Sequence, residues 1–397
     1  MTFALALALA LWTVAVAVTS LWALCEPAAR PLVRWALARL RPRKRAPRIE
    51  GSVIDVLLVR PCAGFDPSLD DNLRSLRAAR REGLRVRCVL ALGDEQDAAA
   101  RSAREAAAWL SAHEIECELR FTHAEGPNHK ADQLARAIAD SKEAIVVVAD
   151  SDVDLSAVDL RALVEPLREG EAEACWVPVA EKGTSEGAGD RASLAILAGG
   201  LHGFSLLARL DPAGMVGKLF SVRRDALENV GGFSSMLRYL GEDVELSRRI
   251  RAAGGAVIAL PLRAYSTASG RTLAAARDRY ARWLLVVRSQ RPALLASYPL
   301  LFFAAPLQVA LGASCLTAHR SFALAVMLVA AGARMLVAAG ARRAAGLSFS
   351  LRATALDSWL GDLVLCAAWL RALTLREVRW RRGVLRFDRE GLLESVR

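Results

Sequence analysis

The chain has 397 residues, of which 54% are hydrophobic and 24% are charged, and its mean hydropathy is +0.26. This is too apolar for an ordinary soluble enzyme and too polar for a chain made only of membrane helices, so we expect a soluble domain joined to membrane segments. The formal charge is +11 and the pI is about 9.8. Much of the positive charge flanks apolar segments and no nucleic-acid recognition motif accompanies it, which favours anionic lipid headgroups over nucleic acid as a partner.

The cysteine positions argue against two kinds of structural site. All 7 are scattered along the chain, with no Cys-x-x-Cys pair and no histidine at metal-binding spacing. This pattern argues against a disulfide framework or a zinc site and favours a reducing compartment.

The N-terminal segment is an almost uninterrupted apolar run over residues 3–24, long enough to cross a bilayer. Basic residues follow the run, between Arg30 and Arg48, and positive flanks stay cytoplasmic. We therefore predict a transmembrane helix over residues 1–28, with its N-terminus outside, and a basic cytoplasmic linker over 29–50. A cleaved signal peptide fits less well because the flanking charge is reversed, and Leu24 is too bulky for a lipoprotein cleavage site before Cys25.

Apolar runs alternate with amphipathic stretches through the next part of the chain. Strands are predicted over residues 53–59, 86–92, 115–121 and 145–149, and helices over 67–81, 96–111 and 130–140. The alternation predicts an α/β domain with a doubly wound parallel sheet, over residues 51–265. In such sheets ligands bind beyond the carboxyl ends of the strands.

Apolar character returns towards the C-terminus. Residues 294–316 and 322–339 are predicted to be two spans, and 356–373 is a third candidate that contains Asp357 and Asp362. Basic residues after 375 argue that the tail stays in the cytoplasm, so we favour two full spans and an interfacial or re-entrant third segment. The corresponding regions are an amphipathic interface segment over 266–293, a membrane region over 294–375 and a basic cytoplasmic tail over 376–397.

Asp150-Ser151-Asp152 follows the apolar strand at 145–149, where ligands bind. Two carboxylates at this spacing can hold Mg²⁺ or Mn²⁺ against a diphosphate, and the cation neutralises the charge of a departing nucleoside diphosphate. A polar strand cap is the alternative for an isolated motif of this kind. An EF-hand loop is excluded because Leu155 and Arg161 stand where glycine and glutamate are needed.

Glu242-Asp243 precedes a predicted helix and could simply cap it. The functional interpretation is a general base that takes a hydroxyl proton during direct displacement at a sugar anomeric carbon. One base without a covalent nucleophile would invert the anomeric configuration.

Arg279-x-x-Arg282-Trp283 begins the stretch that leads to the membrane region. Arginine binds phosphate bidentately and a tryptophan face packs against a sugar or an acceptor, although Arg/Trp pairs also form ordinary membrane-interface belts. Lys130 opens a predicted helix, where backbone N–H groups and an ammonium group suit an anion.

Two further residues are weaker candidates. Asp94, after the strand at 86–92, is placed to bind the base or ribose of a nucleotide, and a solvated loop aspartate is the alternative. His202 is a possible acceptor-site residue and an ordinary structural histidine otherwise.

In this order the motifs resemble the ceramide glucosyltransferase family of membrane glycosyltransferases and its bacterial hopanoid-type relatives, over most of the chain. Arg60-Pro61, Gly64, Asp66-Pro67 and Asn72-Leu73 resemble the family's opening pattern, with Arg60 in place of the usual lysine. The resemblance extends to Asp94, Lys130, Asp150, Asp243, the Arg279–Trp283 motif and Trp380-Arg381-x-Gly383.

The resemblance implies a GT-A (Rossmann-like) fold, a UDP-sugar donor, a divalent metal, inverting transfer and a lipid acceptor reached from the membrane. It implies that Asp243 and Glu242 are catalytic and that Asp150 and Asp152 are metal ligands. The residues that it implies for donor binding are Asp94, Lys130, Asp150 and Arg60. UDP-glucose and ceramide are the favoured substrates. No protein partner is implied, and the expected location is a bacterial-type inner membrane, crossed several times, with a cytoplasmic catalytic domain.

Three other functions compete with this one. The first is transfer of a sugar such as N-acetylglucosamine to a hopanoid or another lipid. The second is a polysaccharide synthase, which shares these motifs but usually needs more spans than this chain offers. The third is an inactive lipid-binding scaffold, which intact chemical positions disfavour.

Overall fold

The computed structural model describes residues 3–40, 46–64, 66–182, 187–267, 270–380, 383–388 and 391–395. The chain forms two compact units. The sheet unit contains residues 44–182, 211–268 and 376–397, and the helical unit contains 1–43, 183–210 and 269–375. The predicted linker residues Arg41, Arg43, Lys44 and Arg45 and the predicted tail residues Arg381 and Arg382 lie outside the described residues.

A mixed sheet forms the core of the sheet unit. Its strands are β1 (Ile54–Pro61), β2 (Leu84–Leu92), β3 (Glu116–Phe121), β4 (Ile145–Ala149), β6 (Ala174–Trp176), β8 (Leu219–Arg223) and β9 (Val257–Ala259). Their order in the described sheet is β3-β2-β1-β4-β8-β6-β9, and the first four are parallel. The strands predicted from apolar runs correspond to β1–β4 and are confirmed. β4 is buried along its whole length, as expected for a strand covered on both faces.

β8 departs from the all-parallel sheet that the sequence suggested. It pairs antiparallel with β4 and with β6, whereas β6 and β9 are parallel. The N-terminal end of β8 therefore lies at the carboxyl edge of β4, where the Asp150 amide donates to the Lys218 carbonyl at 2.8 Å. The α/β fold class is confirmed, and the expectation of an entirely parallel sheet is wrong.

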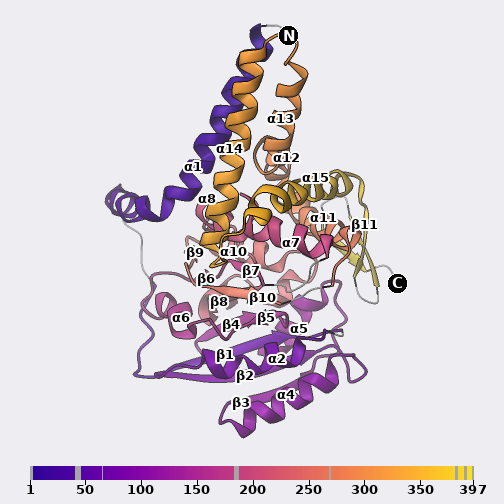
Figure 1. Ribbon diagram of the computed structural model, residues 1–397. Helices are drawn as coiled ribbons and strands as arrows, with labels where there is room; N and C mark the ends of the chain where they lie inside the picture. The colour runs from indigo at the N-terminus through magenta and orange to yellow at the C-terminus, as the bar shows by residue number, and fades with distance from the viewer. Residues whose placement is uncertain are drawn as a thin grey trace. The chain divides into compact units, whose positions relative to one another are not determined.

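Helices cover the sheet. They are α2 (Leu69–Arg74), α3 (Leu76–Ala79), α4 (Ala100–Ala112), α5 (His129–Ile138), α6 (Leu160–Arg168), α9 (Arg224–Asn229), the 3₁₀ turn η1 (Phe233–Met236) and α10 (Glu242–Ala252). Figure 1 shows α4 running along β3. The single helix predicted over 67–81 is wrong, because Ser75 interrupts it: its hydroxyl donates to the Asn72 carbonyl at 2.6 Å and accepts from the Leu155 amide at 2.8 Å.

Two small sheets complete this unit. One contains β5 (Val153–Asp154), β10 (Ala264–Ser266) and β7 (Val179–Glu181), in that order. The other is antiparallel and is formed near the C-terminus by β11 (Glu377–Trp380), β12 (Gly383–Phe387) and β13 (Leu393–Ser395). It docks on Arg238, whose guanidinium pairs with Asp388 at 2.6 Å and whose carbonyl accepts from the Leu393 amide at 2.7 Å.

The helical unit contains long apolar helices. Its elements are α1 (Phe3–Leu40), α7 (Ala188–Ala198), α8 (Phe204–Leu210), α11 (Leu273–Gln290), α12 (Pro292–Leu301), α13 (Ala304–Ser314), α14 (Arg320–Ala344), the π-helical turn η2 (Ala353–Asp357) and α15 (Ser358–Thr374). In the described part of the chain, three stretches are long and apolar enough to cross a membrane: Ala4–Ala29, Arg320–Ala344 and Ala353–Thr374. In Figure 1, α1 and α14 run side by side, and α15 packs against α11 and α7.

The surface of α1 and α14 is unusually apolar for a protein in water. Leu5 and Leu11 on α1 are 60% and 61% exposed, and Leu328 and Leu336 on α14 are 72% and 58% exposed. Exposed apolar surface of this extent is unfavourable in water and favourable in lipid.

The uninterrupted span predicted over 294–316 is wrong. The segment forms α12 and α13, which are bent by 47° at Phe302 and Phe303. Pro299 lies inside α12 and removes one helical donor, and Pro306 lies in the first turn of α13, where proline is tolerated. The pair therefore forms a broken span or a re-entrant loop.

Candidate active site

The Asp150-Ser151-Asp152 turn begins directly after β4, and each aspartate holds a lysine. Asp150 Oδ1 lies 2.8 Å from Lys130 Nζ. Asp152 Oδ2 lies 2.5 Å from Lys218 Nζ and accepts a hydrogen bond from the Ser266 hydroxyl at 2.8 Å. The strand end thus presents two carboxylates with two cations already bound to them.

Lys130 comes from the first turn of α5, whose start is fixed locally. Asn128 caps the helix by accepting from the Ala131 amide at 3.1 Å. The Lys130 ammonium group also lies 3.2 Å from Glu242 Oε1 and donates to the Gly217 carbonyl at 2.9 Å. Burial lowers the pKa of Lys130, but the charges of Asp150 and Glu242 outweigh burial and hold that pKa above its ordinary value.

Glu242 and Asp243 begin α10, so both carboxylates lie at the positive end of the helix dipole. Glu242 is buried and accepts from the Asn128 amide group at 3.0 Å. Asp243 is partly exposed, and it accepts from the Val244 amide at 2.9 Å and from the Gly217 amide. Glu242 is thus fixed by neighbouring side chains, while Asp243 is fixed by the backbone.

Asp243 has the electrostatic character of a base that works near neutral pH. Loss of hydration and the charge of Glu242 raise the pKa of Asp243 to about 6, and Lys130 partly opposes this rise. A carboxylate with such a pKa is ionised at pH 7 and is a stronger base than an ordinary aspartate.

Gly217 is a site residue that the sequence did not reveal. A Cβ on Gly217 would lie 2.6 Å from the Asp243 Cβ, which is closer than real Cβ contacts come. The glycine therefore lets the backbone approach Asp243 closely enough to donate its amide. Its carbonyl meanwhile accepts from Lys130, so one residue contacts both the cation and the carboxylate.

The sequence did not reveal Lys218 as a site residue either, because its position depends on the direction of β8 in the sheet. A lysine before an apolar strand is ordinarily a surface residue at the amino edge of a parallel sheet. Because β8 is antiparallel, Lys218 lies at the carboxyl edge, where it is only 7% exposed and bound to Asp152.

Arg60 has different surroundings from those expected of a donor-binding residue. Its side chain is fully buried and donates to the backbone carbonyls of Asn72, Asp150 and Val153, at 2.5, 3.0 and 2.6 Å. A guanidinium group in this position supports the turn that carries Asp150 from within, and it offers no surface to a donor.

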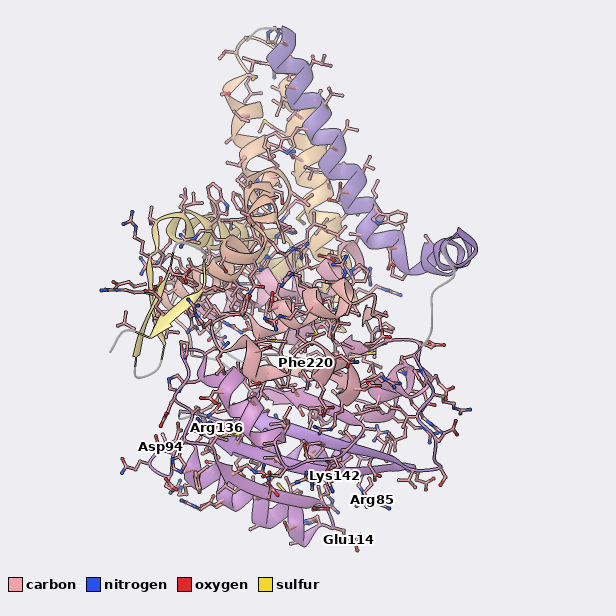
Figure 2. All side chains as sticks on the ribbon, turned by 180° about the vertical axis from the view of Figure 1, so that it is seen from behind. Arg85, Asp94, Glu114, Arg136, Lys142 and Phe220 are labelled. Carbon is pink, nitrogen blue, oxygen red and sulfur yellow. The ribbon has the colours of Figure 1, made fainter. Side chains whose placement is uncertain are left out.

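Asp94 lies in the loop after β2 and is partly exposed. Its carboxylate accepts from the Gln96 amide at 2.9 Å, an interaction that shapes the loop. Figure 2 shows Asp94 and Arg136 towards one side of the sheet unit and Arg85 and Glu114 towards the other.

A groove of about 420 Å³ lies at the far, amino edge of the sheet, lined by Arg85, Glu114 and the apolar side chains of Val53, Leu84 and Ile115. It shares no residue with the cluster around Asp150. The groove is therefore separate from the candidate active site.

The helical unit brings Arg279, Trp283 and His202 into one cluster. Arg279 lies over the Trp283 ring, 4.7 Å from its centroid, and donates to the Ser193 hydroxyl at 3.1 Å. Tyr280 contacts the Trp283 ring edge-on at 5.2 Å and the His202 ring at 6.1 Å. Arg282 is on the same helix, α11, and is partly exposed.

His202 itself is buried. Its Nδ1 lies 2.9 Å from the Tyr298 hydroxyl, whereas its Nε2 has no hydrogen-bond partner among the described residues. Burial lowers the pKa of His202 to about 4, so the imidazole is neutral at pH 7. It can exchange a hydrogen bond with a neutral polar group and does not attract an anion by charge.

The chain is similar to several solved structures. A mannosyltransferase from Pyrobaculum calidifontis, in complex with GDP-Man and Mn²⁺, is 17% identical over 90% of this chain and 99% of its own, with a TM-score of 0.47. Glucosyl-3-phosphoglycerate synthase from Mycobacterium tuberculosis, in complex with Mn²⁺, UDP and glucosyl-3-phosphoglycerate, is 18% identical over 58% of this chain and 79% of its own, with a TM-score of 0.33. TarS from S. aureus is 12% identical over 87% and 100%, with a TM-score of 0.38.

The sequence matches no curated protein. It does match the description of Glycosyl transferase family 21 over residues 5–393, which is nearly the whole chain and includes both units. The resemblance inferred from the motifs is thereby confirmed, and with it the GT-A class of the α/β sheet. The chain is a member of glycosyl transferase family 21 and, by that membership, a glycosyltransferase.

Proposed function

We propose that the chain is a membrane-bound inverting glycosyltransferase that transfers glucose from UDP-glucose to the hydroxyl group of ceramide. The position of Asp243 is the main observation that supports the proposed transfer chemistry. A carboxylate with a pKa of about 6 lies within the same network as Lys130 and Asp150, at the edge of the sheet where nucleotides bind.

Asp243 is proposed to act as the general base. Its carboxylate takes the proton of the acceptor hydroxyl while the hydroxyl oxygen forms a bond to the anomeric carbon. The bond from that carbon to the diphosphate oxygen breaks on the opposite face, and UDP leaves with the electron pair. One displacement of this kind inverts the anomeric configuration.

Lys130 is proposed to bind the diphosphate of the donor. Its ammonium group is held between Asp150 and Glu242, at 2.8 and 3.2 Å, so it is fixed in place before a donor arrives. A fixed cation stabilises the charge that develops on the leaving phosphate without having to reorganise.

A divalent metal is a further part of the proposal. No cluster of three or more His, Cys, Asp or Glu in the described ranges is arranged to hold a metal by itself. Asp150 and Asp152 nevertheless offer hard oxygen ligands, and Mg²⁺ commonly binds one or two carboxylates plus substrate phosphates. The donor set therefore fits Mg²⁺ or Mn²⁺ shared with a diphosphate, and such a cation would neutralise charge on the departing UDP.

The lipid acceptor is proposed from family membership and from the helical unit. Exposed leucines on α1 and α14 suit a membrane, and we propose several crossings with the sheet unit in the cytoplasm. Arg279, Arg282 and Trp283 remain proposed binding residues for diphosphate or acceptor, and His202 a proposed acceptor residue. Asp94 remains the proposed contact for the base or ribose.

A substrate screen on the purified full-length protein in detergent tests this function. UDP-glucose, UDP-galactose and UDP-N-acetylglucosamine are each offered with ceramide, diacylglycerol or a hopanoid, in Mg²⁺ or Mn²⁺, and lipid products are identified by mass spectrometry. The expected product is a β-linked glucosylceramide, since UDP-glucose carries an α-linked sugar. Product on another lipid, or a polymer, would replace the acceptor assignment, and the absence of transfer and of UDP release from folded protein would contradict the function.

A further inference from the structure

We propose that Lys218 is a second diphosphate-binding residue, which occupies Asp152 until a nucleotide and a divalent cation bind together. The inference rests on the proposed function and deepens it, because it assigns a role at the donor site to a residue that no motif identified.

Lys218 is buried and is held by an ion pair and a hydrogen-bonding hydroxyl group. The ammonium group lies 2.5 Å from Asp152 Oδ2 and 3.5 Å from the Ser266 hydroxyl, which donates to the same carboxylate oxygen at 2.8 Å. The side chain is only 7% exposed, and its peptide neighbour Gly217 contacts both Lys130 and Asp243. Lys218 is therefore part of the network at the end of β4.

Each of the two aspartates forms an ion pair with a different lysine. Lys130 holds Asp150 and Lys218 holds Asp152, so a divalent cation that approaches the nucleotide-free protein meets carboxylates that are already neutralised. Such a cation must compete with an ammonium group at each aspartate to bind both. We therefore expect the cation alone to bind weakly.

A diphosphate changes this balance. Lys218 is too buried to give up its carboxylate for water without a large loss of free energy, so it needs another anion. Phosphate oxygens supply that anion and free Asp152 for the cation. Cation binding and nucleotide binding are then coupled, and each must strengthen the other by the same factor.

Binding measurements on the full-length protein in detergent test this role without relying on turnover. Mn²⁺ affinity is measured by electron paramagnetic resonance of free Mn²⁺, with and without UDP, and UDP affinity by calorimetry, with and without MnCl₂. For Lys218→Met we expect MnCl₂ alone to bind about tenfold more tightly and UDP alone about tenfold more weakly, the range for one charge-assisted hydrogen bond. The mutual strengthening of Mn²⁺ and UDP should largely disappear.

Controls separate this role from a structural one. Lys218→Arg keeps the charge and should behave like the parent protein, and Lys142→Met removes an exposed lysine at the amino end of β4, labelled in Figure 2, and should change neither affinity. Should Lys218→Met fail to fold, Ser266→Ala removes the hydroxyl that supports Asp152 and should tighten Mn²⁺ binding in the same direction.

The outcomes are distinct. Unchanged Mn²⁺ affinity and unchanged coupling in folded Lys218→Met, with UDP bound by the parent protein, would overturn the role of Lys218 and leave the proposed function standing. A parent protein that binds no UDP, with or without Mn²⁺, would overturn both.

Discussion

Each unit contains charged side chains away from bulk water, but the two sets are organised differently. In the helical unit Arg334 and Asp362 are 7% and 4% exposed and form a bidentate pair at 2.6 and 2.9 Å. The remaining Arg334 donors bind the Gly199 and Ser358 carbonyls. Arginine and carboxylate are matched one to one, and the whole guanidinium group takes part.

The sheet-unit cluster is not balanced in this way. Four carboxylates, those of Asp150, Asp152, Glu242 and Asp243, are joined in a network with two ammonium groups, and Asp243 is partly exposed. The excess negative charge suits a divalent cation, and burial together with the charge of Glu242 raises the pKa of Asp243. A closed one-to-one pair balances its own charges, whereas an unbalanced, partly exposed cluster can exchange partners with a ligand.

Breaking the Arg334–Asp362 pair should have the largest effect on stability. Arg334→Met leaves a buried carboxylate without its cation and should lower the free energy of unfolding by about 3–5 kcal/mol. The double variant Arg334→Met/Asp362→Leu removes both charges and should regain most of that loss. Denaturation in detergent, or the rate of thermal inactivation, measures both.

Equal losses in the single and double variants would show that the pair does more than balance charge. The acidic residues of the third apolar segment would then need another explanation.

Gly217→Ala is expected to have a smaller effect, which lowers the rate of the chemical step and leaves UDP binding intact. The new Cβ would lie 2.6 Å from the Asp243 Cβ and should push the carboxylate from its position. A misplacement of this size should reduce kcat about 100-fold while UDP still binds. Steady-state kinetics and UDP calorimetry separate the two, and an unchanged kcat would remove Asp243 from the position of base.

The pH dependence should give the smallest effect. Because the pKa of Asp243 is raised to about 6, its base form predominates above that pH, and kcat/KM should fall about fivefold as the pH drops from 6 to 5. Lys130 lowers this pKa, so Lys130→Met should move the decline to higher pH. A rate profile that is flat between pH 5 and 7, or a Lys130→Met profile moved to lower pH, would contradict the electrostatic account.

Residues in local patterns were predictable from the sequence. The apolar run of β4 places Asp150 and Asp152 at a strand end, and the helix-start patterns place Lys130 and Asp243 at the beginnings of α5 and α10. The positions of these residues follow from period and capping alone, and their roles stay predictions.

Residues that depend on strand direction or on distant partners were not predictable. Lys218 reaches Asp152 only because β8 runs antiparallel to β4, and nothing in its local sequence indicates the direction of that strand. The burial of Arg60 depends on carbonyls from two other segments. Asp357 tolerates its apolar segment because Arg191, 166 positions away, pairs with it.

The central claim is that Asp243 is the base of a transfer reaction at this cluster. Its most direct test is Asp243→Asn, assayed for UDP binding by calorimetry and for transfer from UDP-glucose to ceramide by mass spectrometry. Asparagine keeps the shape of the side chain and an oxygen that can accept from the Gly217 amide, but it cannot take a proton. The account predicts UDP affinity within about threefold of the parent and transfer reduced about 100- to 10,000-fold. Transfer at the parent rate in folded Asp243→Asn would contradict it.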